Sequence, residues 1–171
     1  MIFNKVMAVV GERGSYKTCY AVSLAKQYAD QGINVFTNIE LFGIPYKPIH
    51  VDDLVKFHDW LRDGIIIIDE AHTGADSYKF LTTKVQKATK FITQIRKRRL
   101  NFMYITVDFS MIAKRLRDQT DLFFYTTLIK DPHAMIEVVD KRNNHTLLNR
   151  FPFDGSPYFN MYDTNQIIDE S

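Results

Sequence analysis

The stretch that decides the fold is Gly-Glu-Arg-Gly-Ser-Tyr-Lys-Thr, at residues 11–18. It follows residues 6–10, a short and wholly apolar segment, and precedes residues 18–30, whose apolar side chains recur at spacings of three and four. The apolar segment predicts a strand buried on both faces, and the spacing predicts an amphipathic helix. A glycine-containing turn between such a strand and such a helix is the context of a phosphate-binding loop.

The chemistry of this turn points to a nucleotide. Backbone N–H groups and the positive end of a helix dipole converge there on anionic oxygens. Lys17 is expected to reach the β- and γ-phosphates, and the hydroxyl of Thr18 is expected to ligate Mg²⁺. We therefore predict a site for ATP and Mg²⁺, in which the nucleotide contacts Gly11, Glu12, Arg13, Gly14, Ser15, Tyr16, Lys17 and Thr18.

The loop departs from the usual pattern at one position. Tyr16 stands immediately before the lysine, where the phosphate-loop pattern has glycine. Since a Cβ atom restricts the backbone, the loop is expected to use dihedral angles that a non-glycine residue can adopt.

A second motif lies further along the chain. Four consecutive isoleucines at residues 65–68 predict a central strand of a parallel sheet, and Asp69 and Glu70 follow it directly. Ligands of open parallel sheets bind at the carboxyl ends of the strands. Asp69 is expected to hold the water shell of Mg²⁺, and Glu70 is expected to polarise the attacking water as a general base. Glu70 and Lys17 are thus the predicted catalytic residues.

The rest of the chain alternates between strand and helix patterns up to about residue 130. This alternation predicts an α/β fold in three layers, with a mostly parallel central sheet and helices on both faces. The further predicted strands are 33–37, 101–107 and 122–128, and the further helices begin near residues 52, 88 and 111. Beyond residue 130, residues 135–139 and 146–151 predict a small β extension. We expect one domain over residues 1–171, with a core of about 1–130 and a β appendage of about 131–171.

Composition excludes several classes of protein. The chain of 171 residues has 46% hydrophobic and 25% charged residues, which excludes a disordered chain. Its one cysteine, Cys19, cannot form an internal disulfide, which excludes a secreted disulfide scaffold. No apolar run approaches the ~20 residues of a membrane-spanning helix, and no signal peptide is evident. The expectation is a soluble intracellular protein.

The formal net charge of +2 conceals an uneven distribution. Residues 83–99 contain seven lysines and arginines and no acid. On the predicted helix, Lys87, Lys90 and Lys97 share one side, away from the apolar residues. Such a stripe is a candidate track for the phosphate backbone of DNA, and the alternative is an ordinary solvated helix face.

Taken together, the motifs resemble the small viral P-loop ATPases of the FtsK–HerA superfamily, especially the zonular occludens toxin-like and genome-packaging branch. The resemblance covers most of the chain. It rests on the loop at 11–18, Thr37-Asn38-Ile39, the run Ile65 to His72, Arg96 to Arg99 before a strand ending Tyr104-Ile105-Thr106, and the tail Tyr158 to Thr164 with its Tyr-Asp-Thr ending.

This resemblance implies an ATP-driven motor with a RecA-like core that moves viral DNA. The implied partners are double-stranded DNA, further copies of the chain in a homo-oligomeric ring, and capsid or portal-vertex proteins, in the host cytoplasm or the virion. Ring ATPases often supply an arginine to a neighbour's γ-phosphate, and the candidates are Arg98, Arg99, Arg115 and Arg117. The absence of a membrane span favours packaging over export.

The sequence departs from the superfamily at the end of its fourth strand. A polar sensor, commonly glutamine, is frequent there, whereas this chain has Thr106 followed by Val107 and Asp108. Two other functions therefore stay open. One is a nucleoside or nucleotide kinase, against which Glu70 argues because a water-activating base wastes ATP. The other is a nucleotide-dependent switch in virion assembly or extrusion.

Overall fold

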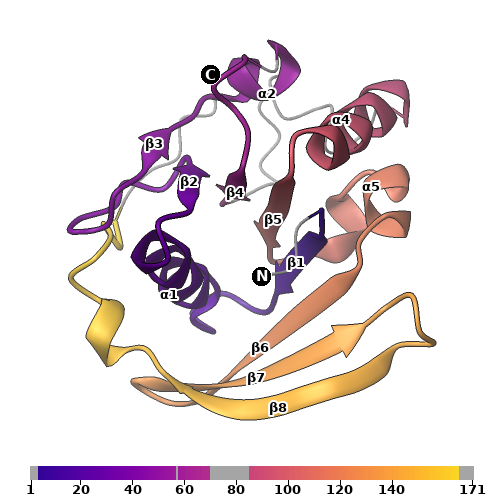
Figure 1. Ribbon diagram of the computed structural model, residues 1–171. Helices are drawn as coiled ribbons and strands as arrows, with labels where there is room; N and C mark the ends of the chain where they lie inside the picture. Colours follow the sequence, from indigo (N-terminus) through magenta and orange to yellow (C-terminus); the bar gives the residue numbers. More distant parts are fainter. Residues whose placement is uncertain (1–3, 57, 70–84, 166–171) are drawn as a thin grey trace.

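The computed structural model describes residues 4–56, 58–69 and 85–165. Within them, eight strands form a single sheet in the order β3-β2-β4-β5-β1-β6-β7-β8 (Figure 1). The strands are β1 (Val6–Val10), β2 (Asn34–Thr37), β3 (Lys47–Pro48), β4 (Gly64–Ile68), β5 (Leu100–Thr106), β6 (Leu122–Lys130), β7 (His133–Asp140) and β8 (Thr146–Asp154). Neighbouring strands from β3 to β6 in this order are parallel, and β7 and β8 are antiparallel to their neighbours.

Helices cover both faces of the parallel part of the sheet (Figure 1). They are α1 (Lys17–Asp30), α2 (Val51–Lys56), α4 (Val85–Lys97) and α5 (Lys114–Asp118), with 3₁₀ turns at η2 (Phe109–Met111) and η3 (Ser156–Tyr158). Apolar side chains of α1 belong to one hydrophobic core, and those of α2, α4 and α5 belong to the other. The predicted three-layer α/β fold with a mostly parallel sheet is confirmed.

The packing of strand β4 explains why apolar and polar residues do not alternate in its sequence. Ile66 and Ile68 pack into the core under α4, while Ile65 and Ile67 pack into the core under α1. All four side chains are buried, because a parallel strand with helices on both faces has no solvent side.

Two helices are shorter than predicted. The helix expected from residue 52 ends at Lys56, so the buried Leu61 belongs to the following loop. The helix expected from residue 111 begins at Lys114. The separate 3₁₀ turn before it is capped by Asp108, whose carboxylate accepts a hydrogen bond from the N–H of Ser110 at 2.8 Å. None of the helices in the described parts of the chain is long and apolar enough to span a bilayer.

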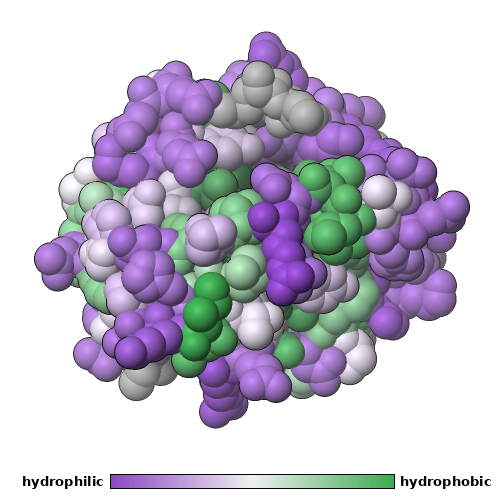
Figure 2. All heavy atoms as spheres, turned by 90° about the horizontal axis from the view of Figure 1, so that it is seen from below, coloured by the Kyte–Doolittle hydropathy of each residue, from purple (hydrophilic) through white to green (hydrophobic). Residues whose placement is uncertain are grey.

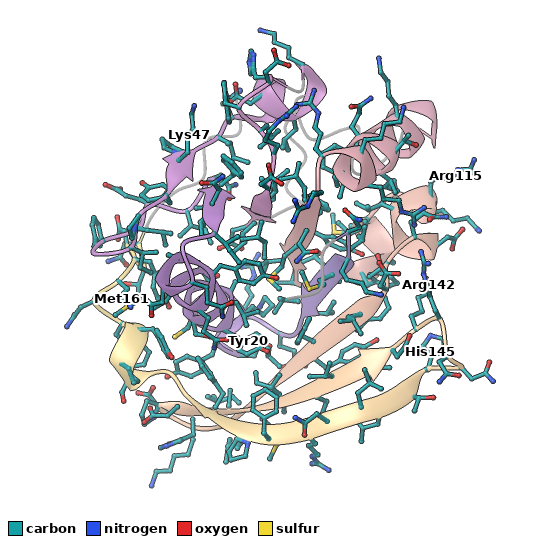
Figure 3. The ribbon with its side chains drawn as sticks, viewed as in Figure 1. Tyr20, Lys47, Arg115, Arg142, His145 and Met161 are labelled. Atoms are coloured by element: carbon teal, nitrogen blue, oxygen red, sulfur yellow. The ribbon has the colours of Figure 1, made fainter. Side chains whose placement is uncertain are left out.

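The C-terminal strands continue the main sheet. Strand β6 is parallel to β1 on one side and antiparallel to β7 on the other, so it belongs to the core and to the extension at once. Strands β7 and β8 run beyond the predicted ranges of 135–139 and 146–151, and they curve under α1 (Figure 1). Tyr20 of α1 fills the space between, with ring centroids 5.5 Å from Phe124, 6.4 Å from Phe151 and 5.3 Å from Phe153 (Figure 3).

Several large apolar side chains of β6 and β8 are exposed on the surface. The exposed large hydrophobic residues of β6 and β8 are Tyr125, Leu128, Ile129, Leu147 and Leu148. The view from the side of β8 shows apolar patches separated by hydrophilic residues (Figure 2). The aromatic residues Phe151 and Phe153 of β8 thus pack against α1, while other apolar side chains of β6 and β8 stay accessible.

The turn between β1 and α1 depends on unusual backbone positions. A Cβ atom on Gly11 would lie 2.3 Å from Oγ1 of Thr126 and 2.5 Å from its carbonyl oxygen, so the loop leaves β1 in close contact with β6. Gly14 has φ +74°, and Tyr16 has φ 67° and ψ 25°, both in the left-handed region. Tyr16 therefore occupies the conformation that a glycine usually supplies, at a cost of about 1–2 kcal/mol.

Contacts with residues 155–164, which we call the C-terminal segment, offset this cost. The ring of Tyr16 stacks on Phe159, with centroids 5.8 Å apart and an interplanar angle of 23°. The segment approaches closely at Gly155, where a Cβ atom would lie 3.1 Å from Tyr16 and from Sγ of Cys19. An aromatic pair contributes about 0.5–1.5 kcal/mol beyond its buried area, which is comparable to the backbone cost.

Substitutions at Tyr16 separate these two contributions. Tyr16→Ala loses the stacking and keeps the left-handed backbone cost, whereas Tyr16→Gly loses the stacking and relieves the cost. We expect Tyr16→Gly to be more stable than Tyr16→Ala by about 1 kcal/mol in urea-induced unfolding. Equal unfolding free energies for the two variants would contradict the left-handed assignment.

The start of β1 is held by Asp121, which directly precedes β6. The N–H of Val6 donates to Oδ2 of Asp121 at 2.9 Å, and the N–H of Asp121 donates to the carbonyl of Val6 at 2.7 Å. The other carboxylate oxygen pairs with Nε of Arg142 at 2.6 Å; the Asp121 side chain is 6% exposed and that of Arg142 is 50% exposed.

Asp121→Ala is therefore expected to lower the free energy of unfolding by about 1–3 kcal/mol, because the buried N–H of Val6 loses its acceptor. Arg142→Ala, the matched control, removes a solvent-accessible cation that water can replace and should cost less than about 1 kcal/mol. Urea-induced unfolding measures both. If Arg142→Ala were the more damaging change, the ion pair and not the backbone contact would hold β1.

Candidate nucleotide-binding site

Two predicted magnesium ligands meet at the carboxyl edge of the sheet. Thr18 lies in the first turn of α1, which follows β1, and Asp69 is the first residue after β4. The hydroxyl of Thr18 donates a hydrogen bond to Oδ2 of Asp69 at 2.7 Å. The parallel direction of the strands brings these groups together although β5 separates β1 from β4 in the sheet.

Asn38 fixes the position of Asp69. Its Nδ2 donates to the carbonyl oxygen of Asp69 at 3.2 Å, and the N–H of Asp69 donates to its Oδ1 at 2.9 Å. Asn38 follows β2, the parallel neighbour of β4. In the sequence, Asn38 was part of the resemblance only, with no role of its own. Its place directly after a strand was the one available signal.

Lys17 lies inside the loop. Its ammonium group donates to the carbonyl oxygen of Glu12 at 2.5 Å, and the residue is 9% exposed. Burial lowers the pKa of Lys17, the charge of Arg13 lowers it further, and the carboxylate of Asp69 opposes this shift. An ammonium group has three donors, so Lys17 can bind an anion while it still serves Glu12.

Ser15 connects the loop to the sheet. Its hydroxyl donates to the carbonyl oxygen of Glu12 at 2.7 Å and lies 2.7 Å from Oγ1 of Thr126 in β6. Both Ser15 and Thr126 are buried. The side chain of Ser15 therefore holds the loop against β6.

The eight predicted loop residues divide between two cavities. The first has a volume of about 360 Å³, and its lining includes Lys17, Thr18 and Asp69. It is lined by Gly14, Tyr16, Lys17, Thr18, Cys19, Ile39, Asp69, Tyr162, Asp163 and Thr164. The second lies between the loop and β6 and is lined by Val10, Gly11, Glu12, Arg13, Ser15, Tyr125, Thr126, Thr127 and Leu128. We take the first cavity as the candidate nucleotide site.

The C-terminal segment forms part of this cavity, although the sequence analysis assigned none of its residues to the nucleotide site. Tyr162, Asp163 and Thr164 line it opposite the loop. These residues form the Tyr-Asp-Thr ending noted in the resemblance, and their place in the wall of the cavity follows from long-range packing. The predicted general base, Glu70, lies outside the described residues.

The predicted DNA-contacting helix packs as its pattern requires. Phe91, Ile92 and Ile95 of α4 are buried, and Lys90 and Lys97 are exposed. Lys87 also belongs to α4. The helix covers the face of the sheet opposite α1 (Figure 1).

The four candidate arginine fingers lie elsewhere in the fold, and none lines the nucleotide cavity within the part of the chain that the structure describes. Arg98 donates from Nη1 to the carbonyl oxygens of His58 at 2.6 Å and Leu61 at 3.3 Å. Nε of Arg99 lies 3.6 Å from a carboxylate oxygen of Asp63. The guanidinium of Arg117 lies 5.6 Å from the ring centroid of Phe109. Arg115 is exposed on α5 (Figure 3).

At the sensor position, Thr106 ends β5 and is buried. Its hydroxyl donates to the carbonyl oxygen of Asp108 at 3.0 Å and accepts from the N–H of Asp108 at 3.2 Å. This hydroxyl therefore closes the turn after β5.

No known family model matches the sequence, and no curated protein matches it. Solved structures do match the fold. The N-terminal domain of zonular occludens toxin from Neisseria meningitidis superposes with a TM-score of 0.68 and 16% identity, over 95% of this chain and 100% of that one. The genome packaging NTPase of Sulfolobus turreted icosahedral virus 2, in complex with ATP-gammaS, has a TM-score of 0.58 and 14% identity, over 88% and 98%.

A third similar structure is the flagellar accessory protein FlaH from Methanocaldococcus jannaschii, with a TM-score of 0.63 and 8% identity, over 89% of this chain and 85% of that one. At such identities the likeness concerns the fold. Two of the three structures come from the groups that the motifs resemble. The chain has the RecA-like fold of P-loop ATPases, as its sequence predicts.

Proposed function

We propose that this protein is an ATPase that drives the translocation of double-stranded DNA in viral genome packaging. The observation that carries the proposal is the hydrogen bond of 2.7 Å between Thr18 and Asp69, beside the buried Lys17. A hydroxyl, a carboxylate and an ammonium group at the start of a helix are the groups that a nucleoside triphosphate and its metal require.

The donor set fits Mg²⁺. Mg²⁺ prefers hard oxygen ligands, and in such sites it takes one or two from the protein and others from phosphate and water. Thr18 and Asp69 would hold it, directly or through water, while Asn38 keeps Asp69 in place by two hydrogen bonds. The ion would neutralise charge on the phosphate oxygens.

The remaining steps belong to the protein's own groups. Lys17 would donate to the β- and γ-phosphates with the hydrogens that Glu12 does not accept, and the charge of the phosphates would favour its protonated form. The N-terminus of α1 would stabilise the same anion. Glu70 would accept a proton from the attacking water.

The motor role draws on three further observations. The genome packaging NTPase of Sulfolobus turreted icosahedral virus 2 shares the fold over nearly its whole length. Lys90 and Lys97 are exposed on α4, where they can follow a phosphate backbone. The candidate arginines lie outside the chain's own cavity, so a finger would have to act on a neighbouring copy, as in a homo-oligomeric ring. Capsid or portal-vertex proteins would complete the assembly.

Lys17→Ala is expected to reduce the rate of ATP hydrolysis by roughly 10²–10³-fold, because it removes a donor to the transferred phosphate. Glu70→Gln should retain ATP binding and lose hydrolysis by roughly 10²-fold or more, because an amide does not accept the proton. Lys26→Ala is the matched control: Lys26 is a lysine of the same helix, paired with Asp30 on the surface. Phosphate release measures all three.

Unchanged hydrolysis in both Lys17→Ala and Glu70→Gln would show that the site is wrong. Phosphoryl transfer to a nucleoside faster than hydrolysis would favour the kinase. ATP binding without sustained turnover, with DNA and capsid partner present, would favour the switch.

Double-stranded DNA is expected to bind with an affinity that falls steeply as salt rises. Each phosphate contact contributes about 0.9 to the slope of log affinity against log salt. Replacing Lys90 and Lys97 together with alanine should flatten this slope by up to about twice that amount. Fluorescence anisotropy of labelled DNA over a salt series provides the measurement.

Lys114→Ala serves as the control, because Lys114 is an exposed lysine of α5 that pairs with Asp118 at 2.7 Å. An equal change of slope in the control and in the double variant would show that α4 acts only through the overall charge. An unchanged slope in the double variant would identify the α4 lysines as a solvated helix face.

A further inference from the structure

The C-terminal segment is held in place on two sides of the nucleotide cavity. On one side, Sγ of Cys19 donates to the carbonyl oxygen of Gly155 at 3.5 Å, and Phe159 stacks on Tyr16. On the other, the N–H of Phe42, beyond β2, donates to the carbonyl of Met161 at 2.8 Å (Figure 3). An antiparallel bridge between Leu41 and Tyr162 extends this contact. The segment thus has a defined path across the cavity.

Tyr162 places the segment next to the metal-binding end of the loop. Tyr162 lines the cavity together with Cys19, the residue after Thr18. Burial raises the pKa of Tyr162, and the charge of Asp69 raises it further. Tyr162, Asp163 and Thr164, which form this wall of the cavity, therefore lie near Lys17 and Thr18, the groups proposed to bind the phosphates and the metal.

Asp163 comes next and lines the cavity. Its Oδ1 accepts the N–H of Asn165 at 2.8 Å, which fixes the carboxylate in a short turn. Within the described residues, its Oδ2 has no hydrogen-bond partner. A carboxylate only accepts hydrogen bonds and repels phosphate, so it fits a neutral donor. In a nucleoside triphosphate, such donors are the ribose hydroxyls and the exocyclic amine of adenine.

We propose that Asp163 accepts a hydrogen bond from the nucleoside part of bound ATP, with Tyr162 and Thr164 beside it in the wall. The phosphate loop then binds the triphosphate, and the C-terminal segment selects what the triphosphate is attached to. This inference rests on the proposed function, since it assumes that the cavity holds ATP.

The test compares binding of four compounds by isothermal titration calorimetry: ATP, 2′,3′-dideoxy-ATP, inosine triphosphate and inorganic tripolyphosphate. Asp163→Ala should lower the affinity for ATP about tenfold, because a hydrogen bond to a charged acceptor is lost, and it should not lower the affinity for tripolyphosphate. The wild type should prefer ATP about tenfold over the analogue that lacks the donor, and the variant should lose that preference. A lost preference over dideoxy-ATP assigns the contact to the ribose, and one over inosine triphosphate assigns it to the amine.

Asn160→Ala is the matched control, since Asn160 is exposed in the same segment and does not line the cavity. Asp163→Asn covers the case in which the alanine variant fails to fold. It keeps an acceptor without the charge, so the affinity for ATP should fall less than in the alanine variant, and the affinity for tripolyphosphate should not fall.

An Asp163 variant that changes ATP and tripolyphosphate binding by the same factor, or changes neither, would overturn the inference and leave the ATP site intact. A wild-type protein that binds neither compound would overturn the proposed function itself.

Discussion

The hydrogen bond between Thr18 and Asp69 joins two strand ends that are not neighbours in the sheet. Strand β5 lies between β1 and β4, so the contact forms only when three parallel strands hold one register. A slip by a single residue would turn every side chain of β4 to the opposite face. Four identical isoleucines would fill both faces in either register, so the register depends on the residues at the two ends of β4. A Cβ atom on Gly64 would lie 2.3 Å from the carbonyl oxygen of Asn34, and Asn38 forms two hydrogen bonds with Asp69. The groups at the edge of the sheet therefore help to fix the register on which the contact between Thr18 and Asp69 depends.

The parts of the site that the sequence could predict are those with a local signature. Residues 6–18 and 65–69 each combine an apolar run with the polar groups that follow it, and both runs form the expected strands. Of the loop residues, Gly14, Tyr16, Lys17 and Thr18 line the candidate site, while the other four line the second cavity. Asn38 has no such signature, because a single asparagine after a strand is common in any loop. Its role depends on β2 being next to β4, which is a property of the whole sheet.

Long-range packing also decides features that have no local signature. Residues 131–171 were expected as a β appendage; their strands β7 and β8 continue the main sheet from β6, and Tyr20 of α1 packs against Phe153 of β8. Tyr16 was expected to use dihedral angles open to a non-glycine residue; it lies in the left-handed region, where its ring stacks on Phe159. No sequence signal near Tyr16 could have predicted this partner, because Phe159 lies far away in the chain. Likewise, Arg98 was a candidate arginine finger from the sequence, and its guanidinium joins the end of α4 to the loop before β4.

The contact between Tyr16 and the C-terminal segment also bears on how the protein is made. The phosphate loop leaves the ribosome early, whereas Gly155 and Phe159 emerge only after all the strands of the sheet. Until then, Tyr16 bears the backbone cost of its left-handed conformation without its stacking partner. A nascent or truncated chain that stops after β7 therefore has an incompletely supported loop. Nucleotide binding by such fragments should be weak, so the first part of the site to be synthesised becomes functional among the last.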